Sequence, residues 1–135
     1  MLNPMTLLTA VMLFLFMPTL NPAPIAQDAA KNPVKATAAS LADAKRLYNQ
    51  DCAVCHGENG NGQTGLAKDM GLKLDDWTDP KTLAGKGDQD LFNTIRKGKD
   101  KMPPEAEGRA KNDEVSNLII YIRRFSSPDT GAGAK

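Results

Sequence analysis

Apolar residues recur with the spacing of an α-helix in three stretches of this 135-residue chain, at residues 39–50, 87–98 and 112–125. The apolar faces are formed by Leu41, Ala44, Leu47 and Tyr48 in the first stretch, by Leu91, Phe92 and Ile95 in the second, and by Val115, Leu118, Ile119, Ile122 and Phe125 in the third. No alternation of apolar and polar residues is long enough to predict a strand. The pattern therefore predicts an all-α fold with three main helices.

Residues at the ends of these stretches support the same three helices. Thr37 or Ser40 is a candidate N-cap for the first helix, Asp88 for the second and Asn112 for the third, because short polar side chains accept the free backbone N–H groups of a first turn. Gly98 follows two basic residues and is suited to end the second helix.

Long irregular segments at 57–87 and 99–111 connect the predicted helices. Such lengths are unusual in a compact domain unless something other than a protein core holds the segments in place. Aromatic residues are few, with four Phe, two Tyr and one Trp in the whole chain. We therefore expect a large apolar cofactor to fill the centre.

The two ends of the chain differ from its middle. Residues 1–26 contain an apolar run from Met5 to Met17 with no Lys or Arg, which predicts a signal peptide or an uncleaved membrane anchor. Residues 27–36 are expected to be a flexible lead-in, 37–126 the folded domain and 127–135 a disordered tail. The predicted location is periplasmic or otherwise extracytoplasmic, with membrane contact only if the leader is uncleaved.

Seventeen basic and sixteen acidic residues give a net charge of +1. A nearly neutral domain has no overall field that would attract nucleic acid, so we expect no nucleic-acid partner.

The segment "CAVCH" holds both cysteines and the only histidine of the chain, Cys52, Cys55 and His56. A thioredoxin-like dithiol would require a strand before the motif, and a structural zinc site would require about four ligands. The spacing matches the C-x-x-C-H pattern of c-type haem attachment. One helical turn brings two thiols to the two vinyl groups on one porphyrin edge and presents the imidazole to iron. We favour haem c, bound through Cys52 and Cys55 with His56 as an iron ligand.

A second axial ligand must come from another residue type, because the chain has no second histidine. After the leader, only Met70 and Met102 remain as thioether ligands. Met70 lies in "GLAKDMGLKL", where a helical turn is expected to bury it as a core residue. Met102 lies in "KGKDKMPPEAEG", where two prolines stiffen the loop. Met102 is the favoured ligand, with Met70 as the alternative.

The order of "LYNQDCAVCHGENGNG", "LFNTIRKGKDKMPP" and "DEVSNLIIYIRRF" resembles that of the mono-haem class I c-type cytochromes from about residue 38 to 126. This resemblance implies the cytochrome c fold, with long loops wrapped around one covalently attached haem. It also implies that the last helix crosses the first, so that Tyr121 and Leu118 meet Leu47 and Tyr48.

One departure from that family concerns the partner of the proximal histidine. Many members carry a proline after the glycine-rich turn, in the loop whose carbonyl accepts the histidine's second ring nitrogen. Here the region reads "GQTGLAKDMGLKL" without proline. A backbone carbonyl near Leu66 is the candidate replacement.

Five further residues have two interpretations each. The indole of Trp77 either donates to a haem propionate or caps the core. Arg96 either pairs with a propionate or complements the helix C-terminus. Lys97, Lys99 and Lys101 either surround the exposed haem edge and steer an acidic partner, or belong to a mixed solvated face.

The sequence thus predicts an electron-transfer protein rather than an enzyme, with transient redox-protein donors and acceptors. The first alternative is a cytochrome subunit tethered to a larger oxidoreductase. The second is a haem sensor or peroxidase-like protein in which Met102 is labile.

Overall fold

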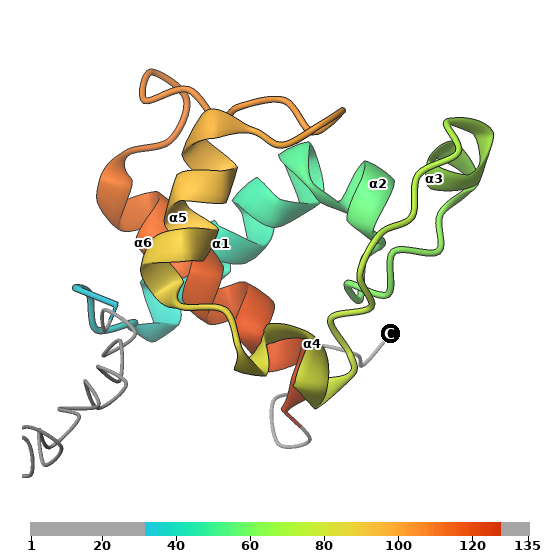
Figure 1. Cartoon of the computed structure of the whole chain (residues 1–135). Coiled ribbons are helices and arrows are strands. Elements are labelled where there is room, and N and C mark those ends of the chain that lie inside the picture. Colours follow the sequence, from blue (N-terminus) through green and yellow to red (C-terminus); the bar gives the residue numbers. More distant parts are fainter. Residues whose placement is uncertain (1–31, 128–135) are drawn as a thin grey trace, which may run out of the picture.

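The computed structural model describes residues 32–127, and the predicted leader and most of the predicted tail lie outside this range. Six α-helices follow one another in it: α1 (Ala38–Asp51), α2 (Ala53–His56), α3 (Gly65–Asp69), α4 (Pro80–Ala84), α5 (Asp88–Lys97) and α6 (Asn112–Arg123), with a 3-10 turn at Arg124–Ser126 (Figure 1). The three predicted helices are confirmed as α1, α5 and α6. The described part of the chain contains no strand.

Two of the predicted caps were wrong by one residue. Asp88 and Asn112 are the first residues of their helices, and the N-caps are Gly87 and Lys111. The capping oxygens come from within each helix: Asp90 accepts the N–H of Gly87 at 3.3 Å, and Glu114 accepts that of Lys111 at 2.7 Å. A carboxylate reaching back to the cap satisfies that N–H whatever side chain the cap carries.

The N-cap of α1 is Thr37, one of the two predicted candidates, and its hydroxyl accepts the N–H of Ser40. The side chain of Ser40 in turn accepts the N–H of Thr37 at 2.9 Å. The lead-in contacts α6, because the Asn32 side chain donates to the Ser116 carbonyl at 2.8 Å.

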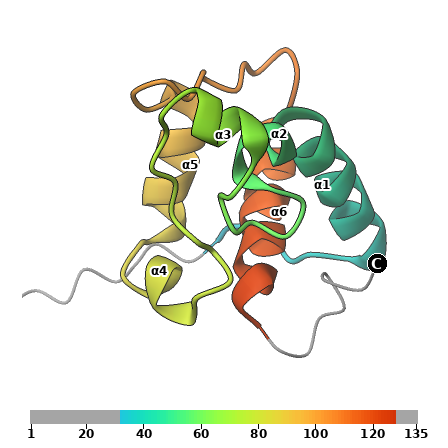
Figure 2. The ribbon, with the colours of Figure 1, turned by 90° about the vertical axis from the view of Figure 1, so that its right-hand side faces the viewer.

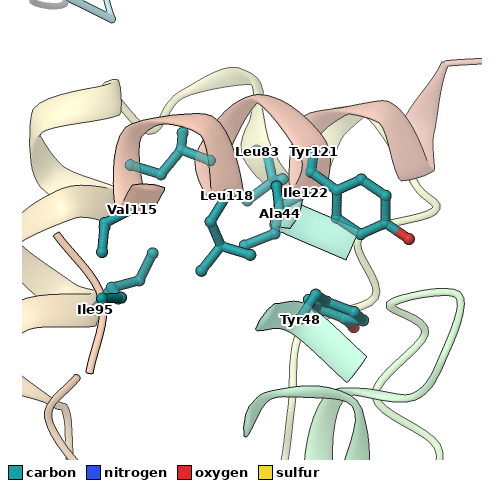
Figure 3. Close-up of a cluster of buried hydrophobic side chains, with 10 residues drawn as sticks. Ala44, Tyr48, Leu83, Ile95, Val115, Leu118, Tyr121 and Ile122 are labelled. Atoms are coloured by element: carbon teal, nitrogen blue, oxygen red, sulfur yellow. The ribbon is translucent and has the colours of Figure 1, made fainter. Parts of the chain in front are cut away.

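Helices α1 and α6 pack against each other, and Leu83 of α4 and Ile95 of α5 join the same cluster of buried side chains (Figure 3). The fully buried large side chains are Tyr48, Leu118, Ile119 and Val115. The rings of Tyr48 and Tyr121 are 5.6 Å apart, and Leu47 packs against the same cluster. The expected contact between the two helices is therefore confirmed.

The segment joining α2 to α5 folds over the core and carries the short helices α3 and α4. Figure 2 shows α4 and α5 on one side, α1 and α6 on the other, and α3 between them. The N-cap of α3 is Thr64, whose side chain accepts the Ala67 N–H, and the N-cap of α4 is Asp79, which precedes Pro80. Helices of five residues are too short to carry an apolar period, so the sequence pattern did not predict them. No helix within residues 32–127 combines the length and apolar character that a bilayer crossing requires.

Candidate cofactor site

The sequence motif at 52–56 forms one helical turn directly after α1. Cys52 is the N-cap of α2, and its carbonyl accepts the N–H of His56 at 2.9 Å. Cys52 and Cys55 are free thiols, both partly buried. Burial, with Asp51 nearby, raises the pKa of the Cys52 thiol to about 12. Because a thiolate is the reactive species in dithiol redox enzymes, this environment opposes a thioredoxin-like role.

His56 is partly buried and its Nδ1 atom is fully buried, with no hydrogen-bond partner among residues 32–127. Burial lowers the pKa of the imidazole, which favours the neutral form that binds metals. The ring of Trp77 stacks on the imidazole, with centroids 4.2 Å apart and planes inclined by 17°. The predicted carbonyl near Leu66 does not bond to His56, and the Leu66 carbonyl accepts the N–H of Met70 instead.

A tight loop after the motif holds His56 against the core. The Tyr48 hydroxyl donates to the Gly57 carbonyl at 2.6 Å, and the N–H of Gly62 donates to the His56 carbonyl at 2.8 Å. Gly60 is required here, because its φ is +77° and a Cβ would lie 2.6 Å from the ring of Phe125.

Met102 lies in a narrow turn after α5. The N–H of Met102 donates to the Lys99 carbonyl at 2.8 Å, and the N–H of Lys99 to the Met102 carbonyl at 3.1 Å. Gly98, with φ +72°, allows this approach, because a Cβ there would lie 2.5 Å from the Met102 carbonyl oxygen. The partly buried Met102 side chain packs against the same core cluster as Cys52 and Trp77. The structure thus places both sulfur-bearing segments against one core.

Arg96 anchors the segment that follows Met102, a role that neither of its sequence interpretations included. Its guanidinium donates to the carbonyls of Glu105 at 3.0 Å and Ala110 at 2.8 Å, and to Asn112 Oδ1 at 2.9 Å. A guanidinium is suited to this because it offers five N–H donors in a fixed plane. Arg96 therefore ties α5 to the whole 105–112 segment.

The sequence model of the family described as "Cytochrome C oxidase, cbb3-type, subunit III" matches residues 39–122. The chain belongs to this family. It is 28% identical over 91 residues to the cbb3-type cytochrome c oxidase subunit CcoP of Azospirillum brasilense, a match that covers 65% of this chain and 29% of CcoP. The chain thus matches less than a third of that relative's length.

Two solved structures are similar to this member of the cbb3 subunit III family. The KustC0563 c-type cytochrome has a TM-score of 0.53 and 29% sequence identity, covering 62% of this chain and 96% of its own. A point mutant of KustC0563 has a TM-score of 0.52 and 28% sequence identity, and the match covers 62% of this chain and 98% of the mutant's chain. The chain is a small c-type cytochrome with the all-α cytochrome c fold.

The c-type cytochrome family implies haem c, and the donor set of this chain fits it. Two free thiols lie on one helical turn with a partly buried imidazole, and a thioether packs on the same core. The buried, unpaired Nδ1 of His56 is the nitrogen left over if Nε2 takes the iron. Within residues 32–127, no three Cys, His, Asp or Glu side chains gather as a metal site of their own.

The other residues that the sequence singled out are Met70, Trp77, Lys97, Lys99 and Lys101. The expected burial of Met70 was wrong, since its residue is 39% exposed, and its carbonyl accepts Lys101 Nζ at 2.9 Å. Lys97 and Lys99 are exposed. Trp77 packs on the core as one interpretation expected, and its stacking on His56 was not foreseen.

Proposed function

We propose that this c-type cytochrome carries single electrons between redox proteins, with one haem c held by Cys52 and Cys55 and ligated by His56 and Met102. The observation that carries the proposal is the single helical turn that joins both thiols to the imidazole, where the Cys52 carbonyl accepts the N–H of His56 at 2.9 Å. When bound, haem supplies a one-electron couple whose potential is raised by a thioether ligand.

The protein's part is to hold both ligands without movement. Burial keeps the His56 imidazole neutral by lowering its pKa, and the Lys99–Met102 turn restricts the backbone that carries the thioether. Gly98 permits that turn, and Arg96 of α5 donates to the Glu105 carbonyl in the segment that follows it. If His56 and Met102 both held the iron, it would have no free position for a substrate, which favours electron transfer over catalysis.

The proposed partners are a redox-protein donor and a redox-protein acceptor that bind transiently. Transient redox encounters use small interfaces, typically below about 1,200 Å². We further propose that the chain is exported to the periplasm or another extracytoplasmic compartment, with residues 1–26 acting as signal peptide.

A second candidate is a subunit attached to a larger oxidoreductase, and the similarity to CcoP favours it. The N-terminus of the native protein distinguishes the two. A mass corresponding to a start near Gln27 supports the mobile carrier, whereas a retained leader and co-purification with an oxidase support the tethered subunit.

Replacing Met102 tests the proposed ligation. The oxidised protein should show the weak far-red absorption band of iron–thioether ligation, and Met102→Ala should abolish it. Met70→Ala is the matched control, because Met70 is exposed and should leave the band unchanged. If the wild-type ferrous protein binds carbon monoxide readily, the carrier proposal fails and the sensor or peroxidase alternative takes its place.

A further inference from the structure

Trp77 makes a contact with His56 that ligand binding alone does not require. The two rings are nearly parallel, with centroids 4.2 Å apart and planes inclined by 17°. Trp77 is the only tryptophan of the chain, and it is partly buried against the core. Its side chain therefore fixes one face of the imidazole by direct contact.

The backbone delivers Trp77 to this position through the loop that follows the cysteines. The N–H of Trp77 donates to the Gly60 carbonyl at 2.8 Å. Gly60 itself lies against Phe125, where no Cβ would fit. The indole is thus held by the loop that also holds His56 through the bond from the Gly62 N–H.

A metal-bound histidine usually has its orientation set by a hydrogen bond from its second ring nitrogen. In this structure Nδ1 of His56 is buried and unpaired within residues 32–127. The hydrogen-bonded support that such ligands normally receive is therefore replaced by a stacking contact.

We propose that Trp77 is a positioning residue for the iron ligand His56: its indole orients the imidazole and keeps water from Nδ1. This inference rests on the proposed ligation by His56. Without the indole, a water molecule would accept a hydrogen bond from Nδ1–H and make the ligand more basic. A more basic ligand stabilises ferric iron, so the reduction potential should fall.

Three variants of the haem-loaded protein test the role. Trp77→Ala removes the stacking face, and Trp77→Phe retains an aromatic ring. Phe125→Leu is the matched control, because it disturbs packing around Gly60 without removing the ring on His56. Redox titration of each variant is combined with proton NMR of the wild-type ferrous protein, which is diamagnetic when low-spin.

The wild type should show nuclear Overhauser contacts between the ring protons of Trp77 and His56. At fixed ambient potential, Trp77→Ala should shift the ferric-to-ferrous ratio roughly tenfold towards ferric. Trp77→Phe and Phe125→Leu should remain within about twofold of the wild type by the same reasoning. All variants should retain the far-red band.

The proposal is overturned if the ring contacts are absent, if Trp77→Ala leaves the ratio unchanged, or if Phe125→Leu shifts the ratio as much as Trp77→Ala. Should Trp77→Ala fail to fold, the nuclear Overhauser contacts between the two rings in the wild type decide the question. Absence of the far-red band from the oxidised wild type would instead refute the proposed ligation by His56 and Met102. The two failures are therefore distinguishable.

Discussion

Tyr48 connects the hydrophobic core to the loop behind His56 through one buried hydrogen bond. Its side chain is fully buried, and its hydroxyl donates to the Gly57 carbonyl at 2.6 Å. The rings of Tyr121 and Phe125 lie 5.6 and 5.1 Å away. At this scale the fold and the site depend on the same residue.

Replacing Tyr48 with Phe should lower the free energy of unfolding by about 1 kcal/mol, because the Gly57 carbonyl loses the Tyr48 hydroxyl and keeps only the N–H of Gly60 as a donor. Urea denaturation of the haem-loaded protein measures the change. Tyr121→Phe is the control, since its hydroxyl makes no hydrogen bond within residues 32–127 and its removal should have a smaller effect. Equal effects from both variants would show that the bond to Gly57 contributes nothing.

Tyr48 should also make stability depend on alkaline pH. Burial raises the pKa of Tyr48 well above its ordinary value of 10. The folded state therefore holds this proton more tightly than the unfolded chain does, and stability should fall as pH rises above about 10. Circular dichroism during urea unfolding should show this loss in the wild type, and Tyr48→Phe should reduce its slope. An unchanged slope would contradict the assignment.

The role of an individual residue was predictable where its residue type and its spacing from its neighbours were enough to indicate a cofactor. Cys52, Cys55 and His56 were assigned from their spacing, and this assignment remains a prediction that the geometry supports. The stacking of Trp77 on His56 was not predictable. It depends on the path of the 57–77 loop, which backbone hydrogen bonds determine and the side-chain pattern does not record.

At the level of elements, the turn after α5 determines where the Met102 thioether lies. Arg96 holds the far end of the segment through the carbonyls of Glu105 and Ala110. Gly98 permits the near end to close. Helix α5 and the 99–111 segment therefore act as one unit.

Arg96→Met should loosen this unit, because the two carbonyls and Asn112 lose a charged donor. Carbon monoxide should bind the ferrous variant about tenfold faster than the wild type, which corresponds to a modest loss of hydrogen-bond stabilisation. Stopped-flow mixing measures the rate. Lys97→Met is the control, since Lys97 is adjacent and exposed, and a similar acceleration there would contradict the role of Arg96.

Gly98→Ala should disrupt Met102 more severely. The new Cβ would lie 2.5 Å from the Met102 carbonyl oxygen, at a backbone φ of +72° that alanine rarely adopts. The far-red band of the oxidised protein should weaken or disappear. Gly85→Ala, where a Cβ has open space, should leave the band intact. A normal band in Gly98→Ala would show that the turn does not position Met102.

The long helices could be predicted because their apolar faces repeat over ten or more residues. The N-caps of α5 and α6 could not be predicted in the same way, since Asp90 and Glu114 supply the capping oxygen from inside the helix. The short helices α2, α3 and α4 lie where local caps and turns, rather than a repeating face, determine structure.

At the level of the whole molecule, α6 joins the two sides of the domain. Its inner face packs on α1, and Arg123 pairs with Asp88 of α5 at 2.6 Å while donating to the carbonyls of Leu83 and Lys86. The all-α architecture and the α1–α6 contact were predictable from the apolar pattern together with the family resemblance. The contacts of Arg123 were not predictable, because its partners lie 35 to 40 residues away along the chain.

The mass of the intact, denatured protein tests the central claim most directly. The polypeptide isolated from its native source should retain the mass of one haem group after acid–acetone extraction, and Cys52→Ser with Cys55→Ser should lose it. A colourless wild-type polypeptide with the mass of the bare chain would contradict the covalent haem site and the electron-carrier function built on it.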